Sequence, residues 1–272
     1  MKRLFVVATL VLFSGVSNMA VAQSSDVGGF IALGAAVTPE YEGSEDYQGV
    51  PLLVGRAHSK SEGYYIELQG TTGRANLIPK SIGAIGKALF LEAGPSINYR
   101  FERSDVENVR VGNLRDVDAA LEVGGFVALS QMGVFGERDS LTGRVEMMGD
   151  TSDAHDGHLV SLSMSYAKPI NKKWRIGLGV DSTYASDKFA DTYFSVDPDN
   201  AARSGLAVYK AEGGFKDVGF NASAMYSFNQ NWGVMTRARF SHLLGDAVDS
   251  PLVKDEGSDN QFFGGVAVSY RF

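Results

Sequence analysis

Cysteine, histidine and long apolar runs are scarce in this chain of 272 residues. Cysteine is absent, which excludes a disulfide framework, thiolate chemistry and any cysteine-ligated metal site. The chain has four histidines, at positions 58, 155, 158 and 242, so few catalytic arrangements that use a histidine as acid or base are possible. Beyond the N-terminus no apolar run approaches the roughly 20 residues that a membrane-spanning helix needs. A mature chain that entered a membrane would therefore do so as a closed barrel.

Basic residues are outnumbered by acidic ones, and the formal net charge of -7 argues against nucleic acid as a partner. Two of the basic residues lie at the N-terminus, in a pattern typical of a signal peptide. Lys2 and Arg3 precede an apolar stretch over 4–13, and Ala20-Val21-Ala22 fits the small-residue cleavage rule. The sequence predicts a cleaved signal peptide over residues 1–22 and one domain over 23–272. The alternative, a short anchor helix, has too few apolar residues to span a membrane.

What the chain has in quantity is alternation at period two, which is typical of strands with two different surroundings. It is clearest over 64–69, 88–101, 117–130, 158–167, 174–184, 218–228, 232–241 and 262–272. In the last of these ranges one face carries Phe262, Val266, Val268, Tyr270 and Phe272, and the other carries Phe263, Gly265, Ala267, Ser269 and Arg271. Strands are also expected over 28–37, 50–57 and 134–147. The sequence predicts an all-β, antiparallel fold.

Three features indicate that the apolar faces meet lipid and the polar faces line a lumen, in contrast to a soluble barrel or sandwich. The polar faces carry Ser, Gly, Asn and single charges. Aromatic residues lie beside short turns or the C-terminus: Tyr166, Trp174, Phe228, Trp232, Tyr270 and Phe272. Connections alternate between short ones at 131–133, 171–173 and 229–231 and long ones at 103–116, 149–157, 186–214 and 245–260. This pattern predicts a closed transmembrane β-barrel in the outer membrane of a Gram-negative cell.

The strand count follows from the requirement that both termini lie in the periplasm, which demands an even number. A weak stretch over 75–78 makes the count twelve; ten is the alternative if the N-terminal hairpins are misread. The charged residues expected in the lumen are Glu67, Glu92, Arg100, Asp118, Glu122, Arg175, Asp181, Arg237, Arg239 and Arg271. They either attract anions or fill the lumen as ion pairs. We favour pairing, because isolated buried charges are costly.

Several stretches carry a family resemblance: Pro39, Tyr41 and Gly43 followed by Tyr47 and Pro51; Gly94-Pro95; Tyr193-Phe194; Ser204-Gly205-Leu206 and Tyr209; Leu244-Gly245-Asp246-Ala247 with Asp249-Ser250-Pro251; and the ending Tyr270-x-Phe272. Over nearly the whole mature chain this order resembles the MipA/OmpV family of outer-membrane proteins. The ending also resembles the assembly signal read by the barrel assembly machinery. The resemblance implies a scaffold that links a murein hydrolase to a murein synthase. Other members are linked to adhesion or to antibiotic uptake and response.

The remaining motifs admit structural and functional interpretations. We favour a loop turn over a cation or partner site for Asp246, Asp249, Ser250 and Pro251, because Asp and Ser bond to nearby backbone and Pro fixes φ. We expect packing at the barrel mouth from Tyr193, Phe194, Ser204 and Tyr209. The only histidine cluster comprises Asp153, His155, Asp156 and His158, and we expect it to form a solvated loop and not a metal site. No nucleophile elbow or phosphate loop is present. We expect no cofactor and a non-enzymatic scaffold, with a narrow channel or binder for small solutes, including antibiotics, as the alternative.

Overall fold

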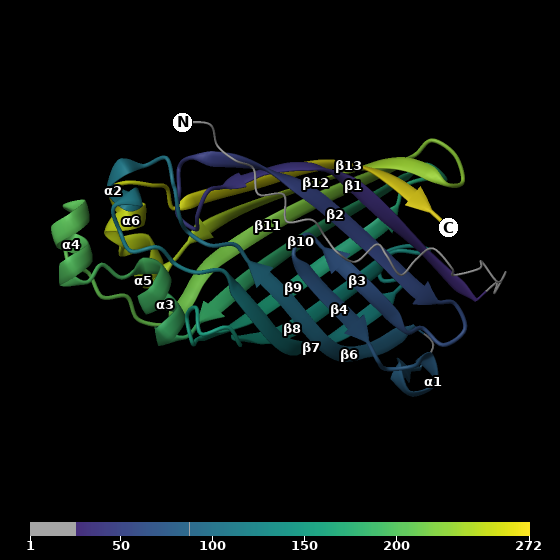
Figure 1. Cartoon of the computed structure of the whole chain (residues 1–272). Coiled ribbons are helices and arrows are strands. Elements are labelled where there is room, and N and C mark those ends of the chain that lie inside the picture. The colour runs from purple at the N-terminus through teal and green to yellow at the C-terminus, as the bar shows by residue number, and fades with distance from the viewer. Residues whose placement is uncertain (1–25, 87) are drawn as a thin grey trace, which may run out of the picture.

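Twelve antiparallel strands form the wall of a closed barrel in the computed structural model, which describes residues 26–86 and 88–272 (Figure 1). Strands that follow one another in the chain are hydrogen-bonded neighbours, and the pairings of β1 with β13 and of β4 with β6 close the wall. The wall strands are β1 (Val27–Pro39), β2 (Tyr47–Ser59), β3 (Tyr65–Gln69), β4 (Thr72–Asn76), β6 (Leu89–Arg100), β7 (Ala120–Met132), β8 (Ser140–Asp150), β9 (His158–Pro169), β10 (Trp174–Ala185), β11 (Gly214–Ser227), β12 (Trp232–Leu243) and β13 (Asn260–Arg271). The predicted fold class and the count of twelve are confirmed, whereas the predicted signal peptide lies outside the described residues.

Two strands differ from the sequence prediction. The weak strand expected over 75–78 is β4, which begins at Thr72 and ends at Asn76. Among the described residues, the two-residue strand β5 (Ala84–Ile85) pairs only with the start of β6 and adds no wall strand of its own. Gln131 and Met132, expected in a turn, belong to β7, and the turn runs from 133 to 139.

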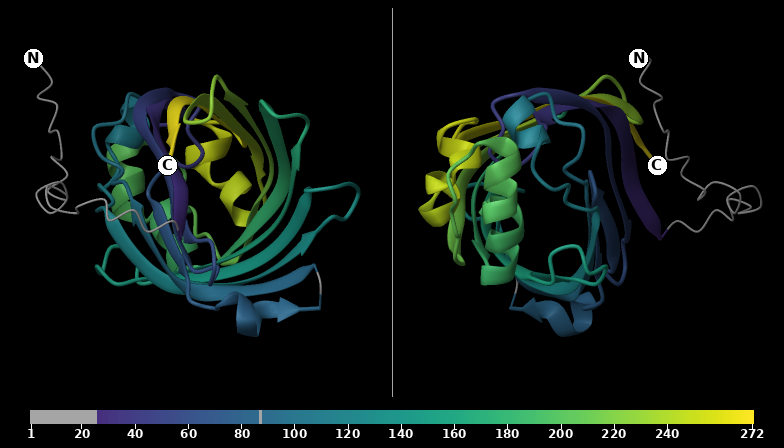
Figure 2. Two further views of the ribbon diagram at one scale, coloured as in Figure 1. Left: turned by 90° about the vertical axis from the view of Figure 1, so that its right-hand side faces the viewer. Right: turned by 60° about the vertical axis from the view of Figure 1, so that its left-hand side comes forward.

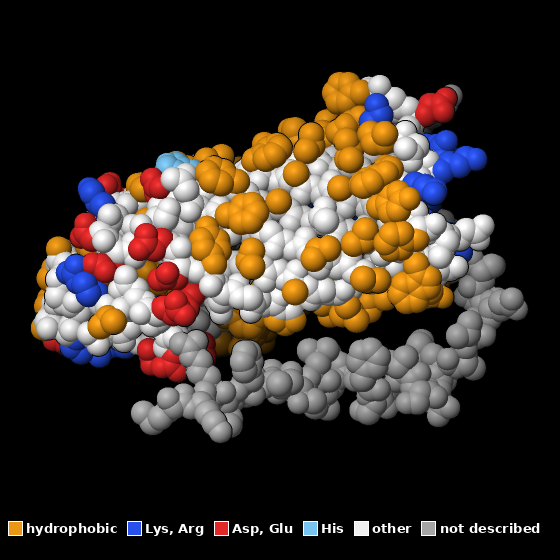
Figure 3. All heavy atoms as spheres, turned by 90° about the horizontal axis from the view of Figure 1, so that it is seen from above, with side chains coloured by type: hydrophobic (Ala, Val, Ile, Leu, Met, Phe, Trp, Pro, Cys, Tyr) orange, Lys and Arg blue, Asp and Glu red, His pale blue; other side chains and the backbone are white. Residues whose placement is uncertain are grey.

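The side chains of each strand alternate between lipid and lumen as the period-two pattern predicts. On β1, Leu33 is 62% exposed while its neighbour Ala32 is 1% exposed. Apolar side chains cover the middle of the outer wall, and charged side chains gather toward the two ends (Figure 3). An exposed apolar band of this kind is stable only against lipid.

The two ends of the barrel differ in their connections. Asp26 and Phe272 lie at the end with the short connections 133–139, 170–173 and 228–231, which we call the turn end. The opposite end, the loop end, carries 101–119, 151–157, 186–213 and 244–259. In outer-membrane barrels the short turns face the periplasm. Outward aromatic pairs mark the turn end: Trp174 with Tyr226 at 4.8 Å and Trp232 with Tyr270 at 5.0 Å between ring centroids.

Short helices interrupt the long loops, to which the sequence analysis assigned no secondary structure. They are α2 (Val109–Gly112), α3 (Asp187–Phe194), α4 (Pro198–Ser204), α5 (Gly245–Asp249) and α6 (Pro251–Lys254), all at the loop end; α1 (Lys80–Gly83) lies at the turn end (Figure 1). Helix α4 has local start and stop signals. The Asp197 side chain accepts a hydrogen bond from the Asn200 N–H at 2.7 Å, Pro198 opens the helix, and Gly205 ends it at a φ of 72°. In the described part of the chain, none of the helices is both long and apolar enough to cross a membrane.

Candidate functional site

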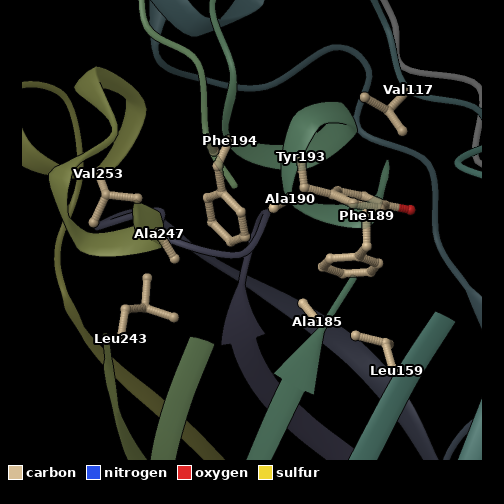
Figure 4. Packing of buried hydrophobic residues seen from close by; sticks show 11 residues of the cluster. Val117, Leu159, Ala185, Phe189, Ala190, Tyr193, Phe194, Leu243, Ala247 and Val253 are labelled. Atoms are coloured by element: carbon tan, nitrogen blue, oxygen red, sulfur yellow. The ribbon is translucent and has the colours of Figure 1, made fainter. Parts of the chain in front are cut away.

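Helices α2–α6 and their connections form a cap over the loop end of the lumen. Seen along the barrel from the turn end, they show behind the opening (Figure 2). Helix α3 contributes Phe189, Tyr193 and Phe194, whose exposed fractions are 0%, 7% and 1%. They pack against Leu243, Ala247 and other buried apolar side chains (Figure 4). The cap therefore has a hydrophobic core of its own.

The stretches that carry the family resemblance meet inside this cap. The fully buried Ser250 hydroxyl donates a hydrogen bond to the Phe194 carbonyl at 2.6 Å and caps α6. The Tyr209 hydroxyl donates to the Asp246 carbonyl at 3.0 Å, and the Asp246 carboxylate accepts from the Glu212 N–H at 2.8 Å. These contacts explain the residue types in these stretches as packing and turn chemistry.

The other motif residues occupy the same region. Tyr41 is buried with Leu252 in a second apolar cluster. Gly43 has a φ of 101°, and a Cβ there would lie 2.5 Å from a methyl carbon of Val253. Pro39 ends β1, Ser204 and Gly205 end α4, and Pro251 begins α6. Asp249 is exposed and pairs with Lys254 at 3.5 Å.

Beneath the cap lies a group of ionised side chains that we call the loop-side cluster: Glu42, Arg100, Glu122, Asp181, Lys216, Asp217 and Arg239. Glu122 is 1% exposed and accepts hydrogen bonds from Asn98 at 2.7 Å and Arg100 at 2.9 Å. Lys216 bonds to Glu42 and, at 2.7 Å, to Asp217. Arg239 bonds to Asp181 at 2.5 Å and to Asp217 at 3.1 Å. Every charge in the cluster has an opposite partner.

The loop-side cluster and the cap are joined by contacts between cations and aromatic rings. The Arg100 guanidinium carbon lies 4.9 Å from the ring centroid of Phe189 and 5.4 Å from that of Tyr193. Such contacts are attractive and gain strength when water is excluded. Helix α3 is therefore held both by its apolar face and by the charged layer under it.

His155 departs from the expectation of a solvated loop, which is wrong for this residue. It is 4% exposed, and its ring lies 5.1 Å from that of Phe189. Nδ1 accepts from the Gly157 N–H at 3.1 Å, so Nε2 carries the hydrogen that faces Glu122 at 3.3 Å. With both nitrogens engaged, this histidine is not placed to act as a general base. Among residues 26–86 and 88–272, no cluster of His, Asp and Glu is arranged to hold a metal ion.

A second group, the central cluster, crosses the middle of the lumen and comprises Arg56, Glu67, Arg74, Arg144 and Glu146. Arg74 donates to both carboxylate oxygens of Glu146 at 2.7 Å. Glu67 lies 3.4 to 3.8 Å from three guanidinium groups. Bidentate pairs in such surroundings are strong and geometrically specific. The cluster therefore ties strands β2, β3, β4 and β8 together across the lumen.

The residues predicted to line the lumen divide into paired and unpaired groups. Glu67, Arg100, Glu122, Asp181 and Arg239 form the ion pairs given above. Glu92 accepts from Tyr65 at 2.7 Å and Ser130 at 3.1 Å, and Arg237 donates to Gln69 at 2.9 Å.

The other three predicted residues stand apart. Asp118 precedes β7 and is exposed. Arg175 and Arg271 are exposed at the turn end. Their strands place both beside Met225: Arg175 is its register partner, and Arg271 lies 3.9 Å from its sulfur. Sequence reasoning missed Arg56, Arg74, Arg144, Glu146, Lys216, Asp217 and Glu42 of the two clusters. The alternation of Arg144 and Glu146 with Val145 and Met147 could have identified two of them.

The chain was compared with known protein families, curated proteins and solved structures. A family model described as MltA-interacting protein MipA matches residues 31–272. The MltA-interacting proteins of Escherichia coli K12 and Shigella flexneri are each 28% identical over 110 residues, which are 40% of this chain and 44% of those proteins. The match thus spans less than half the length of these relatives. Among solved structures, an outer-membrane channel of Pseudomonas putida F1 has a TM-score of 0.42 at 12% identity, covering 91% of this chain and 96% of that one. OmpT of Vibrio cholerae has 0.39 at 10%, covering 90% and 98%.

Proposed function

Because the chain belongs to the MltA-interacting protein family, we propose that it is a non-enzymatic outer-membrane protein that binds a murein lytic transglycosylase at its periplasmic end. In this proposal it acts as a scaffold that brings the hydrolase to a murein synthase. The observation that carries the proposal is the closed loop end, where apolar cap and paired charges occupy the lumen. A barrel closed in this way offers a binding surface to a partner more readily than a path through its interior to a solute.

A surface suited to such a partner lies at the turn end, in the segment 77–85 with α1 and β5. Leu77, Ile82 and Ile85 are 59%, 72% and 52% exposed there. The segment projects from the barrel wall (Figures 1 and 2). We call these three residues the turn-end patch. Exposed apolar side chains beside the periplasm are suitable anchors for a protein interface, since a few buried apolar contacts commonly supply most of the binding energy.

The test is retention of a purified lytic transglycosylase by the full chain in detergent, compared between two variants. Ile82→Asp should weaken retention at least about tenfold, because it places a charge in the apolar centre of the interface. Val109→Asp is the matched control: Val109 is 76% exposed, and it lies on α2 at the opposite end. Equal retention by both variants would place the contact elsewhere, and no retention by the wild type would refute the proposal.

A further inference from the structure

A cavity of about 290 Å³ lies at the side of the loop end, under the cap. The β1–β2 connection lines it with Tyr41 and Glu42, the end of β6 and the residues after it with Arg100 and Arg103, and α3 with Tyr193. Pockets for small molecules usually measure about 300–1,000 Å³, so this cavity suits a small solute.

The cavity has a rim at the outer surface. Gln48, Phe101 and Glu102 line it and are exposed. Residues 47–53 of β2 extend past the end of β3, which pairs only with Val54–His58 of that strand. The short hairpin of β3 and β4 therefore leaves residues 47–52 of β2 without a partner strand among the described residues on this side, next to the rim of the cavity.

Arg103 is a buried cation that forms no ion pair with a described residue, and Asp116 acts on it only from beyond ion-pair distance. It is 8% exposed, its backbone is fixed by pairing with Val117, and its Nη1 donates to the Tyr193 carbonyl at 3.0 Å. The described residues place no carboxylate within ion-pair distance of its guanidinium. Burial lowers the pKa of Arg103 from its ordinary value. A buried unpaired cation is costly unless something compensates for it.

Two further donors in the cavity also lack partners. Tyr41 and Tyr193 are 8% and 7% exposed, and neither hydroxyl makes a hydrogen bond to a described residue, although Ser44 lies near that of Tyr41. Burial raises the pKa of each tyrosine to about 12, so both hydroxyls keep their hydrogens at neutral pH. Buried hydroxyl groups in native proteins are nearly always paired, and an exception needs an explanation.

Four carboxylates line the cavity: Glu102 is exposed on the rim, Glu40 accepts a hydrogen bond from the Glu107 N–H at 2.9 Å, and the other two form ion pairs. Glu42 pairs with Lys216 and Arg100, and Asp217 pairs with Lys216 and Arg239. The cavity is left with one unmatched guanidinium and two unmatched hydroxyl donors. Glu42 adds one acceptor, since its Oε2 is buried without a hydrogen bond and lies 3.8 Å from Arg100.

We propose that this cavity binds a small solute with a carboxylate and a hydroxyl or ammonium group. Arg103 is the counterion of the solute's carboxylate, Tyr41 and Tyr193 donate hydrogen bonds to it, and Glu42 Oε2 accepts from its donor group. A guanidinium matches a carboxylate in a planar, two-bond geometry. The inference does not depend on the murein-enzyme proposal, because the cavity lies at the opposite end from the turn-end patch.

The experiment uses the full chain in detergent and two probes of similar size, gluconate and glucose, followed by saturation-transfer NMR and titration calorimetry. Gluconate has the carboxylate and donor hydroxyls, whereas glucose lacks the carboxylate. The wild type should bind gluconate saturably and glucose not at all. Arg103→Met should reduce gluconate affinity at least about tenfold, because it removes a charged hydrogen-bond partner. Arg115→Met, at an arginine of the same loop that is 65% exposed, should leave the affinity unchanged.

A second pair of variants keeps the test independent of folding defects in Arg103→Met. Tyr41→Phe and Tyr193→Phe retain the buried rings, and each should weaken gluconate binding about threefold to tenfold. Absence of saturable gluconate binding, equal binding of glucose, or no effect of all three variants would overturn the proposal. Displacement of gluconate by inorganic phosphate at equal or lower concentration would overturn the assignment to carboxylates.

Discussion

Glu122 shows how a single residue connects the wall, the loops and the cap. It lies on β7, yet it binds Arg100 of β6 and His155 of the connection 151–157. Its role could be anticipated only in part from the sequence. Alternation along β7 placed it in the lumen, but nothing in the sequence indicated that His155 would fold inward to meet it. Side-chain direction in a strand is a local property, whereas the partner across the lumen is set by the tertiary fold.

Glu122→Ala is expected to lower the free energy of unfolding by about 3 kcal/mol, because it leaves the half-buried Arg100 with only Glu42, at 3.8 Å, as its counterion. Asp118→Ala is the control, since Asp118 is exposed just before the same strand. Urea midpoints of the detergent-solubilised proteins measure the difference. Equal midpoints for the two variants would contradict the structural role of Glu122.

Asp139 organises the turn between β7 and β8. Its carboxylate accepts from the N–H groups of Val134 at 2.8 Å and Phe135 at 3.1 Å, and from the Tyr166 hydroxyl at 2.8 Å. Burial acts to raise the pKa of Asp139, but the hydrogen bonds outweigh it, and the pKa lies below its ordinary value. A lowered pKa in the folded state stabilises the protein above the unfolded-state pKa, and this stabilisation disappears as the pH falls through the folded-state value.

Asp139→Asn should therefore be less stable than the wild type at pH 7, and the gap should shrink once the pH is below about 4, the ordinary value for an aspartate. Glu137→Gln, at an exposed residue of the same turn, should show no such pH-dependent gap. Thermal unfolding followed by circular dichroism at a series of pH values gives the comparison. A gap that stays constant or grows on acidification would show that the carboxylate is not the stabilising group.

Among the secondary-structure elements, strands were more predictable than helices. A strand that separates lipid from lumen repeats its apolar residues at period two, so most wall strands were located within a few residues of their true bounds. Helices α3 to α6 were missed because each is short and is stabilised by packing on the cap core, which leaves too few turns for a periodic signal. The aromatic content of 186–214 pointed to packing at the barrel mouth, and the cavity beneath it could not have been anticipated.

Phe189→Ala should loosen the cap without opening the wall. Phe189 is 0% exposed in the cap core, and deleting such a side chain commonly costs about 3 to 5 kcal/mol. We expect faster amide hydrogen exchange over 187–204, with strands β7 to β12 unchanged. Phe228→Ala, at an outward side chain that is 55% exposed beside the turn end, is the control. Unchanged exchange over 187–204 in Phe189→Ala would contradict the role of α3 as an anchor of the cap.

At the scale of the whole molecule, the barrel combines an apolar outer band with two clusters of ion-paired side chains in its lumen. The outer band and the closure of the wall follow from the sequence pattern, which is why the fold class and strand number could be predicted. How the lumen is filled depends on which charges meet across it, and partners such as Glu146 and Arg74 are 72 positions apart in the chain. Pairing across the lumen gives the barrel cohesion and removes most of the charge that would guide ions through it.

The same architecture predicts the behaviour of the intact protein on a gel. Because the wall is closed and its hydrogen bonds are shielded, the outer-membrane fraction should contain a form that resists cold detergent and migrates differently until it is boiled. A soluble periplasmic protein with no such shift would contradict the outward orientation of the apolar faces.

The central claim is that the capped, charge-paired lumen serves an interaction protein and not a solute channel. Planar-bilayer conductance of the full chain tests it most directly. We predict no reproducible conductance steps, because the cap core and the loop-side cluster close the loop end. Reproducible steps of defined size, retained after removal of contaminating porins, would contradict the claim and favour the narrow channel.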